Sequence, residues 1–216
     1  WEEAGKLPDS LWAKAADIGL LQLGYPEAYG GIAEGIDQWH VNIANEEITR
    51  CGSAGGLVSN LLIHGIGLPP VVNFASEDIK QAVIPPVLAG EKRISLGITE
   101  PSGGSDVANI TTTARRDGEH YIVNGSKTFI SGVMGADWVS TAVRTGGEGA
   151  GGVSMLLIPT DAEGFSRTPL PRKQGWADER ARTLGLAQGL ELGDDLVEHA
   201  LDALLTRQLR HVPQVE

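Results

Sequence analysis

The spacing of apolar positions divides the chain into a helical first part and a β-rich second part. In three early segments the apolar residues recur every three or four positions, which is typical of amphipathic helices. These segments are residues 7–19, 36–50 and 54–66. Within the second segment, one face carries four residues that we expect to point inward: Ile36, Val41, Ala44 and Ile48.

A fourth helix is predicted to begin after Ser76, which is a good N-cap residue. Glu77 and Asp78 follow in the first turn, where negative charge is favoured. This helix ends near Pro85-Pro86 or continues to Gly90. Residues 1–92 are therefore expected to form an all-helical domain.

After Arg93 the pattern changes to short β-rich runs separated by turn residues. The dipeptides Asp117-Gly118 and Asn124-Gly125 separate such runs, and both are strong signals for tight hairpin turns. They predict two successive hairpins, and the pattern predicts further strands at 138–144, 153–158 and around 165–168. Short antiparallel strands at this spacing favour a small β-barrel, which we assign to residues 93–176.

Beyond Trp176 the pattern changes again. Residues 177–193 show no clear period, and Gly193-Asp194 can cap a short helix. That helix would carry an apolar stripe made of Val197, Leu201, Leu204 and Leu205. The predicted fold class is thus α+β: an N-terminal all-helical domain, a small antiparallel β-barrel, and a short helical tail over 177–216.

Composition narrows the classes of partner. The 216 residues are 41% hydrophobic and 21% charged, as in an ordinary soluble globular protein. The formal net charge of −11 argues against nucleic acid or an anionic membrane as the general partner. No run of residues approaches the roughly 18–20 apolar positions of a membrane span. The single cysteine, Cys51, excludes an intrachain disulfide and favours a reducing compartment.

The strongest candidate for chemistry is a strand that opens into a Gly/Ser-rich loop, Leu96 to Asp106. Clustered backbone N–H groups in such a loop can hold phosphate or carbonyl oxygens. A plain turn explains the same pattern equally well. The loop lacks the Gly-Lys-Ser/Thr of a Walker phosphate loop, and it does not match the dinucleotide-binding Gly-x-Gly-x-x-Gly.

A second candidate follows Asn124-Gly125. Strand alternation places Lys127, Phe129 and Ser131 on one face, where an aromatic ring and a hydroxyl could receive a planar heterocycle. Ordinary barrel packing is the alternative interpretation. The five histidines show no ligand spacing, so no metal site is predicted, and His64 is expected to be a core histidine with a hydrogen-bond partner.

Taken together, these stretches resemble the acyl-CoA dehydrogenase family. Ile98–Asp106, Tyr121–Ser131 and Ala136-Asp137 resemble motifs of its middle domain, whose usual form is Thr-Glu-Pro-x-Ala-Gly-Ser-Asp. Gly103 stands here in place of the Ala. Gly19 to Gly31 and Ala89 to Arg93 resemble parts of the family's first helical domain. The resemblance covers roughly residues 5–176.

The resemblance implies that the two domains hold FAD. By position, Leu96, Ile98 and Thr99 would line the isoalloxazine ring. Gly104 and Ser105 would reach the phosphate side of the cofactor, and Ser105 would also meet the acyl-CoA. At the end of the second motif, Phe129, Ile130 and Ser131 would contact the flavin. Phe129 stands where the family often has Trp, and the Ser131 hydroxyl would bond the N5 edge.

The implied reaction is FAD-dependent α,β-dehydrogenation of an acyl-CoA thioester, with an electron-transfer flavoprotein as acceptor. The catalytic carboxylate usually lies in a C-terminal helical domain, and residues 177–216 do not align with that domain. We therefore assign no catalytic residue, and we expect a homo-oligomer only where the helical domain is supplied. The alternatives are an acyl-CoA oxidase, a flavin monooxygenase of the same superfamily, or a non-catalytic fragment. The expected location is cytoplasmic, or the mitochondrial matrix in a eukaryote.

Overall fold

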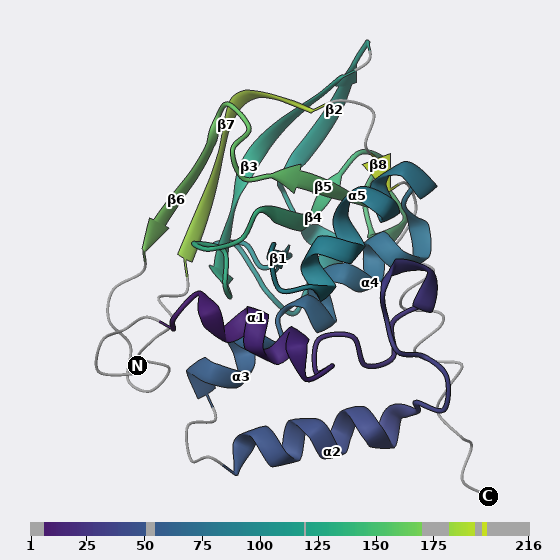
Figure 1. The fold of residues 1–216 in the computed structure, drawn as a ribbon. Helices are drawn as coiled ribbons and strands as arrows, with labels where there is room; N and C mark the ends of the chain where they lie inside the picture. The colour runs from purple at the N-terminus through teal and green to yellow at the C-terminus, as the bar shows by residue number, and fades with distance from the viewer. Residues whose placement is uncertain (1–6, 51–54, 119, 170–181, 193–195, 198–216) are drawn as a thin grey trace, which may run out of the picture.

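The computed structural model describes residues 7–50, 55–118 and 120–169, together with the backbone of strands at 182–192 and 196–197. Helices gather on one side of the molecule and strands on the other (Figure 1). The described α-helices are α1 (Ser10–Asp17), α2 (Gln38–Thr49), α3 (Gly55–Leu61), α4 (His64–Phe74) and α5 (Glu77–Leu88). Single 3-10 turns occupy Glu27–Tyr29, Val107–Asn109 and Ala150–Gly152.

Local chemistry accounts for where the helices begin. The Ser76 hydroxyl accepts a hydrogen bond from the Ile79 amide, 3.4 Å away, so Ser76 is the N-cap of α5, as predicted. At the start of α2 the Asp37 carboxylate accepts from the backbone amides of Trp39 and His40. The inward face predicted for α2 is only half-buried, and no residue of this helix is fully buried. α2 is accordingly a peripheral helix, and Figure 1 shows it apart from the sheet.

The third predicted helix, 54–66, is two helices in the structure. α3 ends at Leu61, and α4 begins at His64 and continues through Pro69 and Pro70 to Phe74. The stretch Gly55–Phe74 is long and apolar enough to cross a membrane by length and composition alone. Its apolar character has a simpler cause, because α4 packs on the sheet and buries Leu68 and Val71 completely.

The strands form one mixed sheet. They are β1 (Ile94–Gly97), β2 (Thr113–Asp117), β3 (His120–Ile130), β4 (Trp138–Arg144), β5 (Val153–Pro159), β6 (Phe165–Pro169), β7 (Arg182–Leu192) and β8 (Leu196–Val197). The order is β6-β7-β3-β2-β4-β5-β8, and β1 pairs with β4. The α+β class is confirmed. The strands are not all antiparallel, because β1 runs parallel to β4 and β2 meets β4 in parallel at Thr113 and Arg144.

One of the two predicted hairpins is present and the other is wrong. β2 and β3 form an antiparallel hairpin in which Asp117 faces His120 across the turn. Asn124-Gly125, however, lies inside the continuous strand β3, at a shift in its register against β7. Gly125 is needed there for close packing: a Cβ atom would lie 2.4 Å from Oγ1 of Thr112. The glycine marks a close backbone approach, not a turn.

The prediction of a helical tail is wrong for the part that the structure describes. Residues 182–192 form β7, which pairs with β3 and β6. Val197 belongs to the short strand β8, which pairs with β5. The other residues of the predicted apolar stripe, and Cys51, lie outside the described residues.

The largest core cluster joins the helices to the sheet. It includes Leu68 and Val71 of α4, Ile84 and Leu88 of α5, and Ile94 of β1, with Ala142, Met155 and Leu157 of the sheet. The residues that alternate with these along β4 and β5, such as Val143 and Leu156, point to the other face of the sheet and belong to a second cluster. β5 is therefore buried on both faces, which explains its nearly continuous apolar sequence.

A polar junction fixes the entry into β1. The backbone N–H of Arg93 donates to Asp137 Oδ2 at 2.9 Å, and Lys92 Nζ lies 2.7 Å from Asp137 Oδ1. The Arg93 guanidinium lies 4.4 Å from the centre of the Trp12 ring. These contacts tie α1, the start of β1 and the start of β4 together, directly before the Gly/Ser-rich loop.

Candidate functional site

The Gly/Ser-rich loop begins with a tight turn at the end of β1. Glu100 and Gly103 exchange two backbone hydrogen bonds of 3.0 and 3.1 Å, which close the turn around Pro101 and Ser102. Residues 101–106 are all exposed. The loop is thus exposed to solvent, while the two backbone hydrogen bonds between Glu100 and Gly103 fix its first turn.

Glu100 closes the base of the loop from inside the protein. The residue is 3% exposed, and its carboxylate accepts hydrogen bonds from Thr111 and Thr112, at the end of the loop. Oε2 accepts from the Thr111 amide at 2.7 Å and from the Thr111 hydroxyl at 2.6 Å, and Oε1 accepts from the Thr112 amide at 2.9 Å. The start and the end of the loop are therefore joined through one buried side chain.

Lys127 of β3 supplies the opposite charge. Its side chain is completely buried, and Nζ donates to Glu100 Oε1 at 2.8 Å and to the Ile98 carbonyl at 3.0 Å. Burial alone would raise the pKa of Glu100, but hydrogen bonds from Lys127, Thr111 and Thr112 hold it well below its usual range. Burial lowers the pKa of Lys127, and the bond to Glu100 opposes that shift. The two groups form a buried ion pair.

The end of β3 departs from strand geometry. Phe129 has a backbone φ of 59°, in the left-handed region, and is 59% exposed. This bend breaks the alternation, so the prediction that Lys127 and Phe129 share one face is wrong: Lys127 and Thr128 are both buried and Phe129 points to solvent. An aromatic residue held in such a conformation at an exposed site suggests a functional constraint.

The structure brings the two predicted motifs side by side. The Thr128 amide donates to the Thr99 carbonyl at 2.8 Å, and the Ser95 hydroxyl donates to the Ser131 carbonyl at 2.9 Å. Residues 95–99 therefore run along residues 128–131. Thr99 and Ser131 are half-buried at this junction, next to the exposed Phe129.

The remaining predicted site residues differ in exposure. Gly104 and Ser105 are exposed on the loop, and a Cβ on Gly104 would lie 3.4 Å from Cγ2 of Thr99. Leu96 and Ile98 are half-buried against the main core cluster. Ile130 is buried with Val133 and Val139, so only its backbone is available to a ligand.

These residues fit a planar, electron-rich heterocycle with an attached phosphate. The exposed Phe129 ring offers a stacking surface, half-buried hydroxyls lie at the junction, and exposed backbone N–H groups follow at Gly104 and Ser105. Among the residues that the structure describes, no group of three or more His, Cys, Asp or Glu side chains could hold a metal ion.

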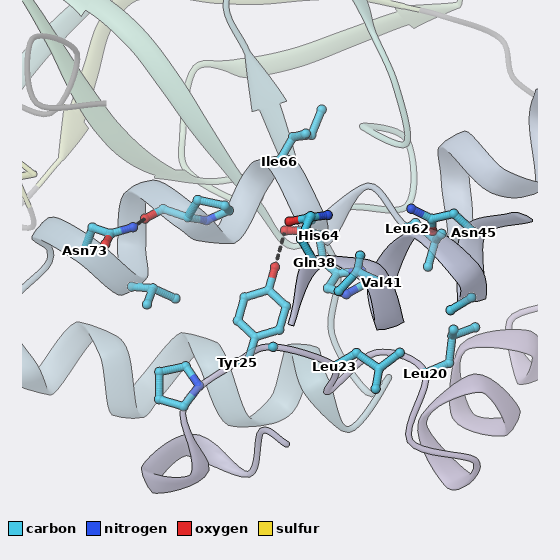
Figure 2. Close-up of a pocket in the computed structure, with 16 residues that line it drawn as sticks. Leu20, Leu23, Tyr25, Gln38, Val41, Asn45, Leu62, His64, Ile66 and Asn73 are labelled. Atoms are coloured by element: carbon cyan, nitrogen blue, oxygen red, sulfur yellow. Dashed lines mark hydrogen bonds between the residues drawn. The ribbon is translucent and has the colours of Figure 1, made fainter. Parts of the chain in front are cut away.

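A separate cavity of about 630 Å³ lies in the helical region. Residues of three segments line it: the loop at 20–26, α2 and α4. Figure 2 shows Tyr25 pointing toward α4, where its hydroxyl donates to the His64 carbonyl at 3.1 Å. His64 is buried, as predicted, with its ring Nε2 3.1 Å from the Leu21 carbonyl, and burial lowers its pKa to about 4. None of the predicted site residues lines this cavity.

Sequence reasoning missed the Glu100–Lys127 pair. The two residues lie far apart in sequence, and each was seen only as part of a motif. The available signal was that a lysine follows Val123 within a β-rich run, and a glutamate directly follows the buried strand that ends at Ile98. Charged side chains at positions expected to be buried usually have an ionic partner.

The fold is a two-part unit, in which a helical domain packs on a sheet that carries an exposed loop. Two family models match almost all of its described residues. Residues 1–91 match the acyl-CoA dehydrogenase N-terminal domain, and residues 95–187 match the acyl-CoA dehydrogenase middle domain. The chain belongs to the acyl-CoA dehydrogenase family.

Individual relatives agree with this assignment. Acyl-CoA dehydrogenase apdG of Emericella nidulans is 37% identical in an alignment 175 positions long, which covers 74% of this chain and 40% of that protein. The crystal structure of a probable acyl-CoA dehydrogenase from Mycobacterium abscessus is 39% identical, with a TM-score of 0.86, over 97% of this chain and 55% of the other. An acyl-CoA dehydrogenase complexed with FAD, from Bacillus anthracis, is 32% identical, with a TM-score of 0.80, over 93% of this chain and 34% of the other. The chain thus spans roughly half the length of these relatives or less.

Proposed function

We propose that the chain supplies the FAD- and acyl-CoA-binding part of an acyl-CoA dehydrogenase. The observation that carries the proposal is the side-by-side placement of residues 95–99 and 128–131, which joins Thr99, Phe129 and Ser131 at one edge. The family assignment and the FAD complex of a relative support the same cofactor.

The residues at this edge would hold FAD, and the cofactor would supply an acceptor for the hydride of the acyl β-carbon. Each residue of the chain then has a role in binding. The Phe129 ring packs on the flavin and excludes water from it. The half-buried Ser131 would place its hydroxyl at the N5 edge, where a donor would favour the electron-rich reduced form. Gly104 and Ser105 direct backbone N–H groups at the phosphates, and Ser105 also meets the acyl-CoA.

Other parts of the proposal rest on the family. The two binding domains are residues 1–92 and a middle domain that begins at residue 93 and includes β7, which pairs with β3. An electron-transfer flavoprotein is the acceptor, and subunits associate through the C-terminal helical domain of the complete enzyme. The location is cytoplasmic, or the mitochondrial matrix in a eukaryote. We assign no catalytic base, because Glu100 is already bound to Lys127 and two amides inside the protein.

Titration of the purified 216-residue chain with FAD, followed by flavin fluorescence, tests the binding role. We expect quenching that saturates, and a flat titration would contradict the proposal and favour a non-catalytic fragment. Addition of acyl-CoA to the flavin-loaded chain, supplemented with the C-terminal half of a relative, should bleach the flavin absorbance. Rapid peroxide formation in the same cuvette would instead indicate an oxidase or a monooxygenase.

A further inference from the structure

The two halves of the candidate site are not held together by the regular hydrogen bonds of the sheet. β1, which leads into the Gly/Ser-rich loop, pairs with β4, whereas β3, which ends in Phe129, pairs with β2 and β7. The contact between the halves depends on individual bonds, such as that from the Thr128 amide to the Thr99 carbonyl. Something other than strand register must fix their relative position.

The Glu100–Lys127 pair is placed at this contact. Lys127 Nζ donates to two groups of the first half, the Ile98 carbonyl at 3.0 Å and Glu100 Oε1 at 2.8 Å. Lys127 itself is two residues before Phe129 in β3. Its ammonium group therefore bonds the residues on both sides of Thr99 while its backbone leads directly to the aromatic residue.

The Glu100 carboxylate extends this connection to the far end of the loop. It accepts from the Thr111 amide and hydroxyl and from the Thr112 amide, at 2.6–2.9 Å. Three segments of the chain, at residues 98–100, 111–112 and 127, thus meet at two charged groups. A fully buried ion pair adds little net stability, but it strongly disfavours every arrangement in which one charge loses its partner. Such a pair selects one geometry for the segments that it joins.

We propose that Glu100 and Lys127 are positioning residues, which hold the Gly/Ser-rich loop and the Phe129 end of β3 in one register for the cofactor. The inference rests on the proposed function for the identity of the ligand. Neither residue contacts the ligand in this proposal. They act through Thr99 and the loop backbone on one side and through Phe129 on the other.

The test compares Glu100→Gln and Lys127→Met with a control of similar burial. Both variants keep the approximate side-chain length and remove one charge of the pair. Val143→Ala is the control, because Val143 is fully buried and belongs to the separate cluster on the other face of β4. Thr111→Val is a milder variant, since Thr111 is exposed and the change removes one hydrogen bond to Glu100.

Two measurements are made on each 216-residue variant: amide hydrogen exchange at Thr111, Thr112 and Thr128, and the FAD dissociation constant. We expect Glu100→Gln and Lys127→Met to speed exchange at these amides and to raise the dissociation constant, each by about tenfold, which corresponds to one charged hydrogen bond. Thr111→Val should give a smaller change of the same kind. Val143→Ala should lower the melting temperature but leave both site measurements within about twofold of wild type.

Equal exchange in the pair variants and in Val143→Ala would overturn the inference, because the pair would then contribute only general stability. Faster exchange with an unchanged FAD dissociation constant would overturn it as well, since the register would not matter to the ligand. If the unmodified chain binds no FAD, the proposed function fails. In that case faster exchange at Thr128 still supports the pair as the element that sets the register, and unchanged exchange refutes it.

Discussion

Phe129 provides a test that separates backbone strain from ligand binding. Its φ of 59° lies in the left-handed region, which costs a residue with a Cβ atom about 1–2 kcal/mol relative to glycine. Glycine in turn loses about 0.5–1 kcal/mol through the greater freedom of the unfolded chain. The relevant comparison is therefore Phe129→Gly against Phe129→Ala, because both variants lose the same aromatic ring.

We expect the glycine variant to be more stable than the alanine variant by roughly 0.5–1 kcal/mol, the difference between these two effects. In an ordinary strand the order is reversed. The contribution of the ring, which is 59% exposed, cancels in the comparison. Urea denaturation followed by tryptophan fluorescence measures the two free energies of unfolding.

The same two variants test the binding role of the ring. Both should weaken FAD binding by about tenfold, the value of one aromatic stacking contact, whereas Phe129→Trp should bind FAD as well as the unmodified chain. An alanine variant more stable than the glycine variant would refute the strained conformation. Unchanged FAD affinity in both variants would refute the contact between Phe129 and the flavin.

Three further predictions concern the same region. Because the folded pKa of Glu100 is lowered from its ordinary 4.5, the stability that its ionised form contributes is complete above about pH 5 and is lost as the pH falls. The difference in the free energy of unfolding between the unmodified chain and Glu100→Gln, measured by urea denaturation, should therefore be largest at pH 7, at about 3 kcal/mol, and should narrow toward pH 3; a constant difference would contradict the argument. Ser131→Ala should weaken flavin retention or slow flavin reduction by about tenfold without changing the melting temperature, and unchanged retention together with an unchanged rate would rule out the N5-edge contact. Gly125→Ala should lower the free energy of unfolding by about 3 kcal/mol or more, because the new Cβ would lie 2.4 Å from Thr112 Oγ1. The control is Gly65→Ala in α4, where nothing lies within 4 Å of the new Cβ, and this change should be neutral or stabilising by up to ~1 kcal/mol. Equal melting temperatures of the two variants would show that β3 can move away from Thr112.

Local patterns predicted most of the helices and strands, and the misses have identifiable causes. Ser76 caps α5 as expected, because capping depends on a few neighbouring atoms. The second half of α4 was missed because the predicted helix ended at residue 66, whereas α4 continues through Pro69 and Pro70, residues that usually interrupt a helix. The packing of Leu68 and Val71 into the main core stabilises this helix, and such packing involves residues distant in sequence.

The candidate site shows the same limit. The resemblance predicts flavin contacts for Thr99, Phe129 and Ser131, and in the structure residues 95–99 run along residues 128–131. The bend at Phe129 could not be inferred from alternation, because alternation assumes a regular strand. The bond between Lys127 and Glu100 joins residues 27 positions apart, and only the folded chain shows that these charges meet.

The composition of the main core also has a consequence for synthesis on the ribosome. Leu68, Val71 and Ile84 lie in the helical part, but the residues that cover them include Ala142, Met155 and Leu157 of the sheet. A nascent chain that has emerged only as far as residue 92 lacks the sheet residues that cover α4 and α5 in the folded protein. We expect these helices to remain exposed to chaperones until β5 has left the exit tunnel, and a fragment ending at residue 92 to aggregate when expressed alone.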